Sequence, residues 1–128
     1  MRISRQDVEV VMDIPGATMR LHRGFGSAGE LGGISCEYFS LAAGVDTTPL
    51  FVGLDGDVCQ CPHWGYVLEG TLTTTDAAGV EETVTAGDLF YWPAGHNVRV
   101  IADAEIVMFS PQDAHMSVIN HMLDKVRE

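Results

Sequence analysis

Residues 57–70 read DVCQCPHWGYVLEG, and they indicate both the fold and a candidate site. The second half of the stretch is rich in aromatic and β-branched residues and ends in glycine, which is typical of a strand followed by a turn. In the first half, metal-binding side chains alternate with other residues: Asp57, Cys59, Cys61 and His63. Alternate side chains of an extended chain leave the same face, so we expect these four groups to converge.

Short runs of the same kind recur along the chain and predict an all-β domain. They are rich in Val, Ile, Thr, Tyr and Phe and are separated by 14 glycines and 5 prolines that are scattered rather than concentrated. This rhythm is typical of a sandwich or a small barrel. The expected strands cover residues 8–12, 18–23, 34–42, 49–52, 64–70, 71–75, 80–84, 88–92, 97–101 and 105–109. The connection DAAG at 76–79 predicts a hairpin, because its glycine tolerates a positive φ.

Only the carboxyl end is expected to be helical. Ser110 is the expected N-cap, with Pro111 at the first helical position. Apolar residues then recur at helical spacing, at Met116, Ile119, Leu123 and Val126. A helix is therefore predicted over about 111–127. His115 and His121 on this helix are expected at the surface or in an interface.

Size and charge exclude several classes of function. At 128 residues the chain has room for one domain, and 7 Lys plus Arg against 18 Asp plus Glu leave a net charge of −11. This charge repels phosphate backbones and anionic lipids, so we expect neither a nucleic-acid partner nor a membrane partner. The amino terminus lacks the apolar region of a signal peptide, and no apolar run approaches the roughly 20 residues of a membrane span. We therefore expect a cytoplasmic protein.

A second cluster of site-type residues follows at 93–98, where PAGHNV presents His96 after a proline-glycine turn. Thiolate sulfur and imidazole nitrogen are the ligands that zinc favours. The sequence therefore predicts a divalent-metal site, most simply zinc, formed by Cys59, Cys61, His63 and His96. Two alternatives stay open: a barrel without metal, in which the cysteines are small buried hydrophobes, and a redox thiol pair. Asp57 is a further ligand, a partner that orients one of the histidine ligands, or a residue of the turn at 55–57.

Together, CPHWGYVLEG at 61–70, AGD at 86–88 and PAGH at 93–96 resemble the cupin family, a jelly-roll barrel also called a double-stranded β-helix. Aligning Gly70 with the last glycine of the family's first motif puts Asp57, Cys59 and His63 on its usual ligand positions. The glycines and proline of the second motif match, but its histidine and asparagine fall on Val98 and Ala102. The combination CxCPHWG with PxGH resembles a small cupin subgroup of unknown function.

The resemblance implies one cupin domain over residues 1–128, with a barrel core at about 15–110 and the carboxyl-terminal helix outside it. It also implies a small-molecule ligand and a homodimer, for which the helical residues Met116 and Met122 offer an apolar contact. Trp64 and Trp92 either line the ligand pocket or fill the core.

Cupins have many activities, so two hypotheses about function remain. The first is a protein that binds or senses a small molecule, with a closed metal site or none. The alternative is a metal-dependent enzyme of isomerase, lyase or hydrolase type, with an open coordination position. Tyr38 and Asp57 are candidates for proton transfer, and no residue is assigned as catalytic.

Overall fold

The computed structural model describes residues 1–128, and it contains one seven-stranded antiparallel sheet and two α-helices. The strands are β1 (Glu9–Ile14), β2 (Ala17–His22), β3 (Ile34–Leu41), β4 (His63–Asp76), β5 (Glu81–Thr85), β6 (Leu89–Trp92) and β7 (His96–Pro111). The helices are α1 (Thr48–Phe51) and α2 (Gln112–Val126), and short 3₁₀ turns lie at Arg5–Asp7, Gly29–Leu31 and Asp55–Asp57. The expected all-β fold with a short carboxyl-terminal helix is confirmed.

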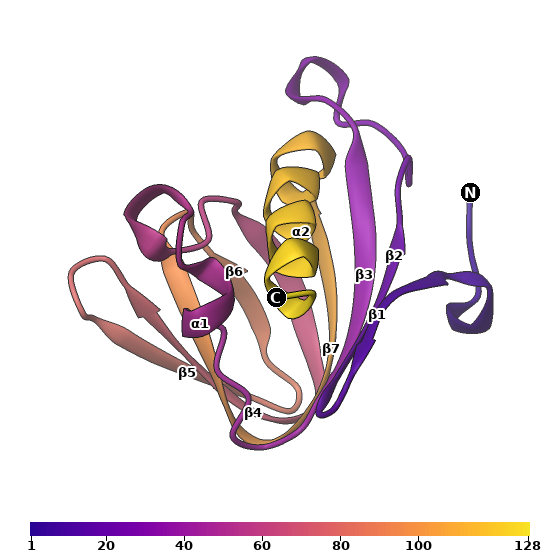
Figure 1. Cartoon of the computed structure of the whole chain (residues 1–128). Coiled ribbons are helices and arrows are strands. Elements are labelled where there is room, and N and C mark those ends of the chain that lie inside the picture. Colours follow the sequence, from indigo (N-terminus) through magenta and orange to yellow (C-terminus); the bar gives the residue numbers. More distant parts are fainter.

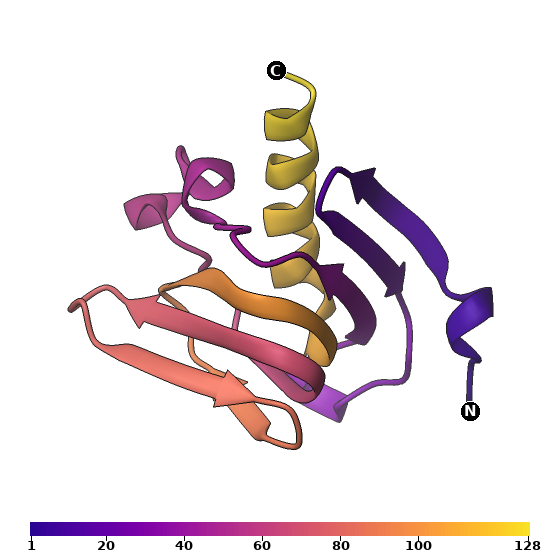
Figure 2. The ribbon, with the colours of Figure 1, turned by 90° about the horizontal axis from the view of Figure 1, so that it is seen from below.

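The sheet has the strand order β1-β2-β3-β7-β4-β5, and β6 also pairs with β4. It bends so strongly that its two halves face each other as the walls of a jelly-roll barrel. In Figure 1 the halves meet at the bottom of the view, and α1 and α2 lie in the opening between their upper ends. The view in Figure 2 shows α2 between the β1–β3 half and the β4–β5 half. The helices therefore close the mouth of the barrel.

Two long strands carry the bend, where the sequence predicts four shorter ones. The runs at 64–70 and 71–75 join in β4, and those at 97–101 and 105–109 join in β7. The register between β4 and β7 shifts around Gly70, which has a φ of 87°. A Cβ at Gly70 would lie 2.2 Å from the Asp103 carbonyl oxygen. Glycine thus marks a bend within a continuous strand rather than a turn between two strands.

The prediction of a strand at 49–52 is wrong, because Thr48–Phe51 forms the helical turn α1. Pro49 lies in the first turn, where its missing N–H is not needed, and the Asp46 carboxylate accepts a hydrogen bond from the Thr48 N–H at 2.8 Å. A short apolar run carries no periodicity that separates the two structures. The hairpin at 76–79 is confirmed: it joins β4 to β5.

The helix at the carboxyl end is confirmed, but its start and its buried face differ from the prediction. Ser110 and Pro111 belong to β7, and no side chain caps α2. The buried face consists of His115, Val118, Ile119 and Met122. His115 and Met122 are therefore not surface residues, because the whole face packs into the barrel mouth. Met122 does not form the exposed contact that the dimer hypothesis assumed.

The interior has two apolar clusters. One fills the barrel between β4, β5, β6 and β7, around residues such as Val67 and Leu72. The other joins β1 and β2 to the two helices and includes Met19, Cys59 and Cys61. The candidate site therefore lies between the barrel core and the helices. None of the helices has the length and apolarity needed to cross a membrane.

Candidate metal centre

Cys59 reaches the site through a backbone bridge to the beginning of β7. Its N–H donates to the His96 carbonyl oxygen at 2.9 Å, and its own carbonyl oxygen accepts from the N–H of Gly95 at 2.7 Å and of His96 at 3.2 Å. Gly95 has a φ of 94°, which the tight turn after Pro93 requires. The proline-glycine turn thus aligns the two ligand clusters that the sequence separates.

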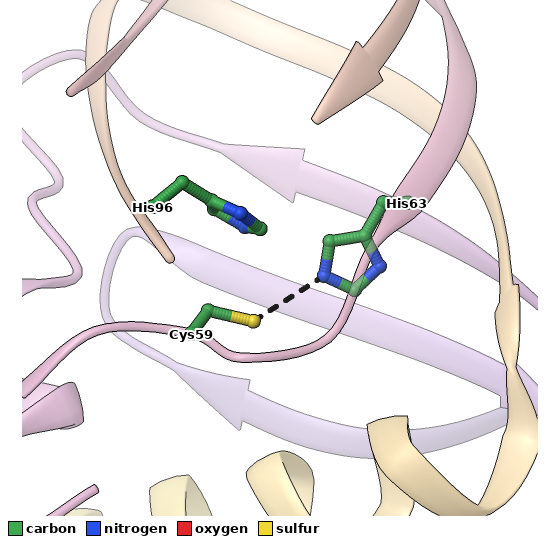
Figure 3. Close-up of side chains that lie close together, drawn as sticks. All are labelled: Cys59, His63 and His96. Atoms are coloured by element: carbon green, nitrogen blue, oxygen red, sulfur yellow. Dashed lines mark hydrogen bonds between the residues drawn. The ribbon is translucent and has the colours of Figure 1, made fainter. Parts of the chain in front are cut away.

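His63 completes a group of three potential metal ligands. It is the first residue of β4 and pairs with Trp92 of β6. The ligand atoms of Cys59, His63 and His96 lie within 4.8 Å of one another, and all three residues are buried. Cys59 Sγ lies 3.5 Å from His63 Nε2. Figure 3 shows the three side chains pointing toward one another from the loop, from β4 and from β7.

Hydrogen bonds orient both imidazole rings of this group. His63 Nδ1 lies 2.7 Å from Ser110 Oγ, and His96 Nδ1 lies 2.7 Å from the Pro93 carbonyl oxygen. A carbonyl only accepts, so Nδ1 of His96 carries the proton. Ser110 Oγ donates to a Glu37 carboxylate oxygen at 3.4 Å, which leaves its lone pair to accept from His63 Nδ1. Both rings therefore offer an unprotonated Nε2, the form that binds a metal.

A buried carboxylate, which the sequence analysis did not single out, holds this arrangement together. Glu37 on β3 is fully buried and accepts hydrogen bonds from Ser35 Oγ at 2.9 Å, from Ser110 Oγ and from His115 Nδ1. The sequence did contain a signal that His115 is buried. It lies three, four and seven residues before the other buried residues of α2. No sequence spacing connects Glu37 with His115, because the two lie on different elements.

The other predicted site residues lie outside the group. Cys61 is fully buried, and its Sγ lies 3.3 Å from the Pro62 carbonyl oxygen and 4.0 Å from that of Pro111. The chain bends at Cys61, so alternate side chains do not share one face there. Asp57 is exposed, and its carboxylate accepts a hydrogen bond from the Gly53 N–H at 2.9 Å. Asp57 is therefore a turn residue.

Burial controls the protonation of the site. It raises the pKa of the Cys59 thiol to about 11, and it raises the pKa of Cys61 as well. Burial, followed by the neighbouring His115 and His96, holds the pKa of His63 well below its usual range. The pKa of His96 is lowered mainly by burial. At neutral pH the site thus contains neutral imidazoles and a protonated thiol, whose proton a metal would displace.

An apolar cavity of about 80 Å³ adjoins the three side chains. Cys59, His63 and His96 contribute to its wall together with His115 and Trp92, and the rest is mainly aliphatic. Trp92 therefore lines the pocket, whereas Trp64 is half exposed on the outside of the sheet and stacks on Tyr91 with ring centroids 5.2 Å apart. Tyr38 does not contribute to this cavity.

Known proteins share the fold. A family model described as "Cupin domain" matches residues 60–110, and no curated protein matches the sequence. Oxalate decarboxylase of Bacillus subtilis superposes with a TM-score of 0.59 and 19% identity over 84% of this chain and 28% of its own. The polyketide cyclase RemF of Streptomyces resistomycificus has a TM-score of 0.54 and 19% identity over 86% and 78% of the two chains. KdgF of Halomonas sp. has a TM-score of 0.56 and 15% identity, and the match covers 88% of this chain and 96% of KdgF.

These similarities show the fold and not the activity, because the sequence identity to each of the three structures is below 20%. The chain also spans only 28% of the length of oxalate decarboxylase. The matched segment, residues 60–110, contains His63, His96 and the proline-glycine turn. The bent antiparallel sheet extends the likeness over most of the chain. The chain therefore matches the cupin family model over residues 60–110 and shares the fold of these solved structures.

Proposed function

We propose that this protein binds a divalent metal ion of zinc type through Cys59, His63 and His96 and acts on a small organic molecule in the adjoining cavity. The observation that carries the proposal is the convergence of three buried ligand atoms within 4.8 Å of one another. Both imidazoles are oriented through Nδ1, as is usual for metal-binding histidines.

The ligand types support zinc. One thiolate and two imidazoles match zinc and other borderline metals, whereas manganese and magnesium favour oxygen ligands. The oxalate decarboxylase neighbour is described with Mn(II) centres, but the present group contains no carboxylate. A thiolate also disfavours the non-haem iron oxygenase arrangement of two histidines and one carboxylate.

The number of ligands supports the enzyme over the closed binding module. A structural zinc ion takes four protein ligands, and a catalytic one takes three. Cys61, the predicted fourth ligand, points its sulfur toward backbone carbonyl oxygens instead. When bound, such a metal supplies Lewis-acid chemistry that polarises a carbonyl or activates water. The chain's own residues supply the apolar cavity, which holds the substrate and excludes water.

Two structural neighbours are named as enzymes, a decarboxylase and a cyclase. Their names do not transfer a substrate to this chain, but they show that the fold accommodates chemistry on small molecules. Homodimerisation remains a prediction, which sedimentation velocity tests. We also retain the proposal of a cytoplasmic location, which the three free cysteines support.

Elemental analysis of the reduced protein, purified and then reconstituted with zinc, tests the proposal. We expect about one zinc per chain, lost in Cys59→Ser and retained in the matched variant Cys61→Ser. Both cysteines are buried, so a serine at either position has the same general effect of placing a polar group in the interior. The comparison of the two variants therefore isolates the loss of a metal ligand. A wild-type protein that holds no zinc above background would overturn the metal site. Equal loss of zinc in both variants would restore Cys61 as a ligand and favour the closed site.

A further inference from the structure

The outside of the sheet carries five large apolar side chains that solvent reaches. Trp64 of β4 pairs with Tyr91 of β6 on one side and with Phe109 of β7 on the other. Tyr66, two residues further along β4, pairs with Leu89 of β6. Directly paired residues and alternate residues of one strand share a face of the sheet, so these five side chains form one surface. We call it the outer apolar face, and its members are between 40% and 83% exposed.

The same outer surface continues onto β3, where the chain covers it with its own amino-terminal segment. Tyr38 of β3 pairs with Val107 of β7, which lies on the same side of that strand as Phe109. The Arg5 guanidinium lies 5.6 Å from the centroid of the Tyr38 ring and also pairs with Glu105 at 3.2 Å. The amino-terminal segment thus covers the β3 half of the surface, and the outer apolar face is the half that stays exposed.

The rings of this face are arranged for packing rather than for stacking a flat ligand. Trp64 and Tyr91 stack on each other with centroids 5.2 Å apart and an interplanar angle of 23°. This distance is close to the roughly 4.8 Å between neighbouring strands, so the two rings stand side by side on the sheet with their faces toward each other. Such rings present no flat platform to a sugar or a base, whereas a second apolar sheet face interdigitates with them.

Charge favours a second copy of this chain as the partner. The outer apolar face contains no charged residue, although the chain has a net charge of −11. A basic partner would be attracted to the acidic parts of the surface instead of this neutral one. Two copies repel each other wherever carboxylates meet, so they associate best through a surface that has none. A neutral apolar face is also complementary to itself, as a two-fold contact requires.

We propose that the outer apolar face binds the same face of a second copy and forms a two-fold symmetric dimer. The exposed fractions of its five side chains correspond to about 500 Å² per copy, since one aromatic side chain offers roughly 150–250 Å². Two copies would bury about 1,000 Å² in total, the area at which specific interfaces begin, and residues at the rim add to it. This inference goes beyond the proposed function and does not depend on the metal site.

Sedimentation velocity over a range of protein concentrations tests the dimer with matched charge variants. Leu89→Glu puts a carboxylate on the most exposed residue of the face. Val80→Glu adds the same charge on a residue that is 63% exposed and hydrogen-bonded to Asp76, at the opposite end of β4 from Trp64. We expect Leu89→Glu to raise the dimer dissociation constant roughly tenfold or more, and Val80→Glu to change it by less than about twofold.

Lysine at the same two positions separates local repulsion from the repulsion between whole molecules. Leu89→Lys makes the chain less acidic but still places a charge within the contact. We expect it to weaken the dimer as Leu89→Glu does, with Val80→Lys as its control. A dimer that Leu89→Lys strengthens, in a protein with unchanged circular dichroism, would contradict the proposal, because net charge and not the outer apolar face would then govern association.

Acrylamide quenching of tryptophan fluorescence locates the contact. Trp64 is 48% exposed and Trp92 is 2% exposed, so acrylamide reaches mainly Trp64 in the monomer. We expect quenching to decrease as the concentration rises into the dimer range, and to stay high in Leu89→Glu. A wild-type protein that remains monomeric at every concentration would overturn the proposal and assign the face to a different partner. A dimer in which Trp64 stays fully quenchable would also overturn it, since the contact would then lie on another surface.

Discussion

His115 Nδ1 hydrogen-bonds to a carboxylate oxygen of Glu37 across 78 residues of sequence, and both side chains are buried. This contact attaches α2 to β3 at the mouth of the barrel. Through Ser110 it also connects the helix to the ring of His63. The carboxyl-terminal helix is therefore part of the candidate site rather than an appendage of the barrel.

Removing the Glu37 carboxylate should destabilise the protein strongly. Glu37→Leu leaves Ser35, Ser110 and His115 without their acceptor in a buried environment. We expect a loss of about 3–5 kcal/mol in the free energy of unfolding, measured by chemical denaturation. Glu81→Leu is the control, because Glu81 pairs with Arg99 at an exposed position and its loss should cost about 1 kcal/mol or less. Similar losses in the two variants would contradict the structural role of Glu37.

Gly65 is expected to tolerate no side chain. A Cβ there would lie 2.3 Å from both Phe90 Cζ and the Val107 carbonyl oxygen. Gly65→Ala should therefore lower the free energy of unfolding by about 1–3 kcal/mol or more, through overpacking between β4, β6 and β7. Gly33→Ala serves as the control, since its nearest neighbour would be Gln112 Oε1 at 3.7 Å. A stable Gly65→Ala protein would show that the strands do not approach as closely as described.

The metal-free protein should lose stability as the pH falls below about 6.5. The pKa values of His63 and His96 are lowered in the folded protein, so the unfolded chain takes up protons first. Above pH 6.5 both states hold these histidines neutral and stability does not depend on them. Below it, each histidine contributes a slope of at most about 1.4 kcal/mol per pH unit. Thermal denaturation between pH 5 and 8 measures this pH dependence of stability. The double variant His63→Gln, His96→Gln should show a flatter dependence of stability on pH.

Zinc binding should release about one proton per chain at pH 8. The pKa of Cys59 is about 11, so its thiol is protonated there, and the neutral histidines have no proton to lose on binding through Nε2. Calorimetric titrations in two buffers with different ionisation enthalpies measure the number of protons. Cys61→Ser should preserve the release. A binding reaction that releases no proton would exclude Cys59 as a thiolate ligand.

The fold and part of the site could be predicted from local sequence, because their causes are local. Runs rich in Val, Ile, Thr, Tyr and Phe between glycines and prolines predicted most strands, and the proline-glycine pattern at 93–95 predicted the turn that presents His96. Cys59 and His63 were candidates because thiolate sulfur and imidazole nitrogen are the ligands that zinc favours. The merging of runs into β4 and β7 was missed, since Gly70 permits either a turn or a bend, and only the contact with Asp103 selects the bend.

Tertiary structure decided what local pattern could not. The bend at Cys61 removes that thiol from the group, because alternation holds only in an extended chain. The orientation of α2 decides which of its faces is buried, and it turns His115 inward although an isolated histidine on a helix is usually exposed. Glu37, which accepts the hydrogen bond from His115, lies 78 residues earlier, on β3. Local sequence thus indicates an all-β barrel with candidate ligands, and the packing of distant elements selects the side chains that share a cavity.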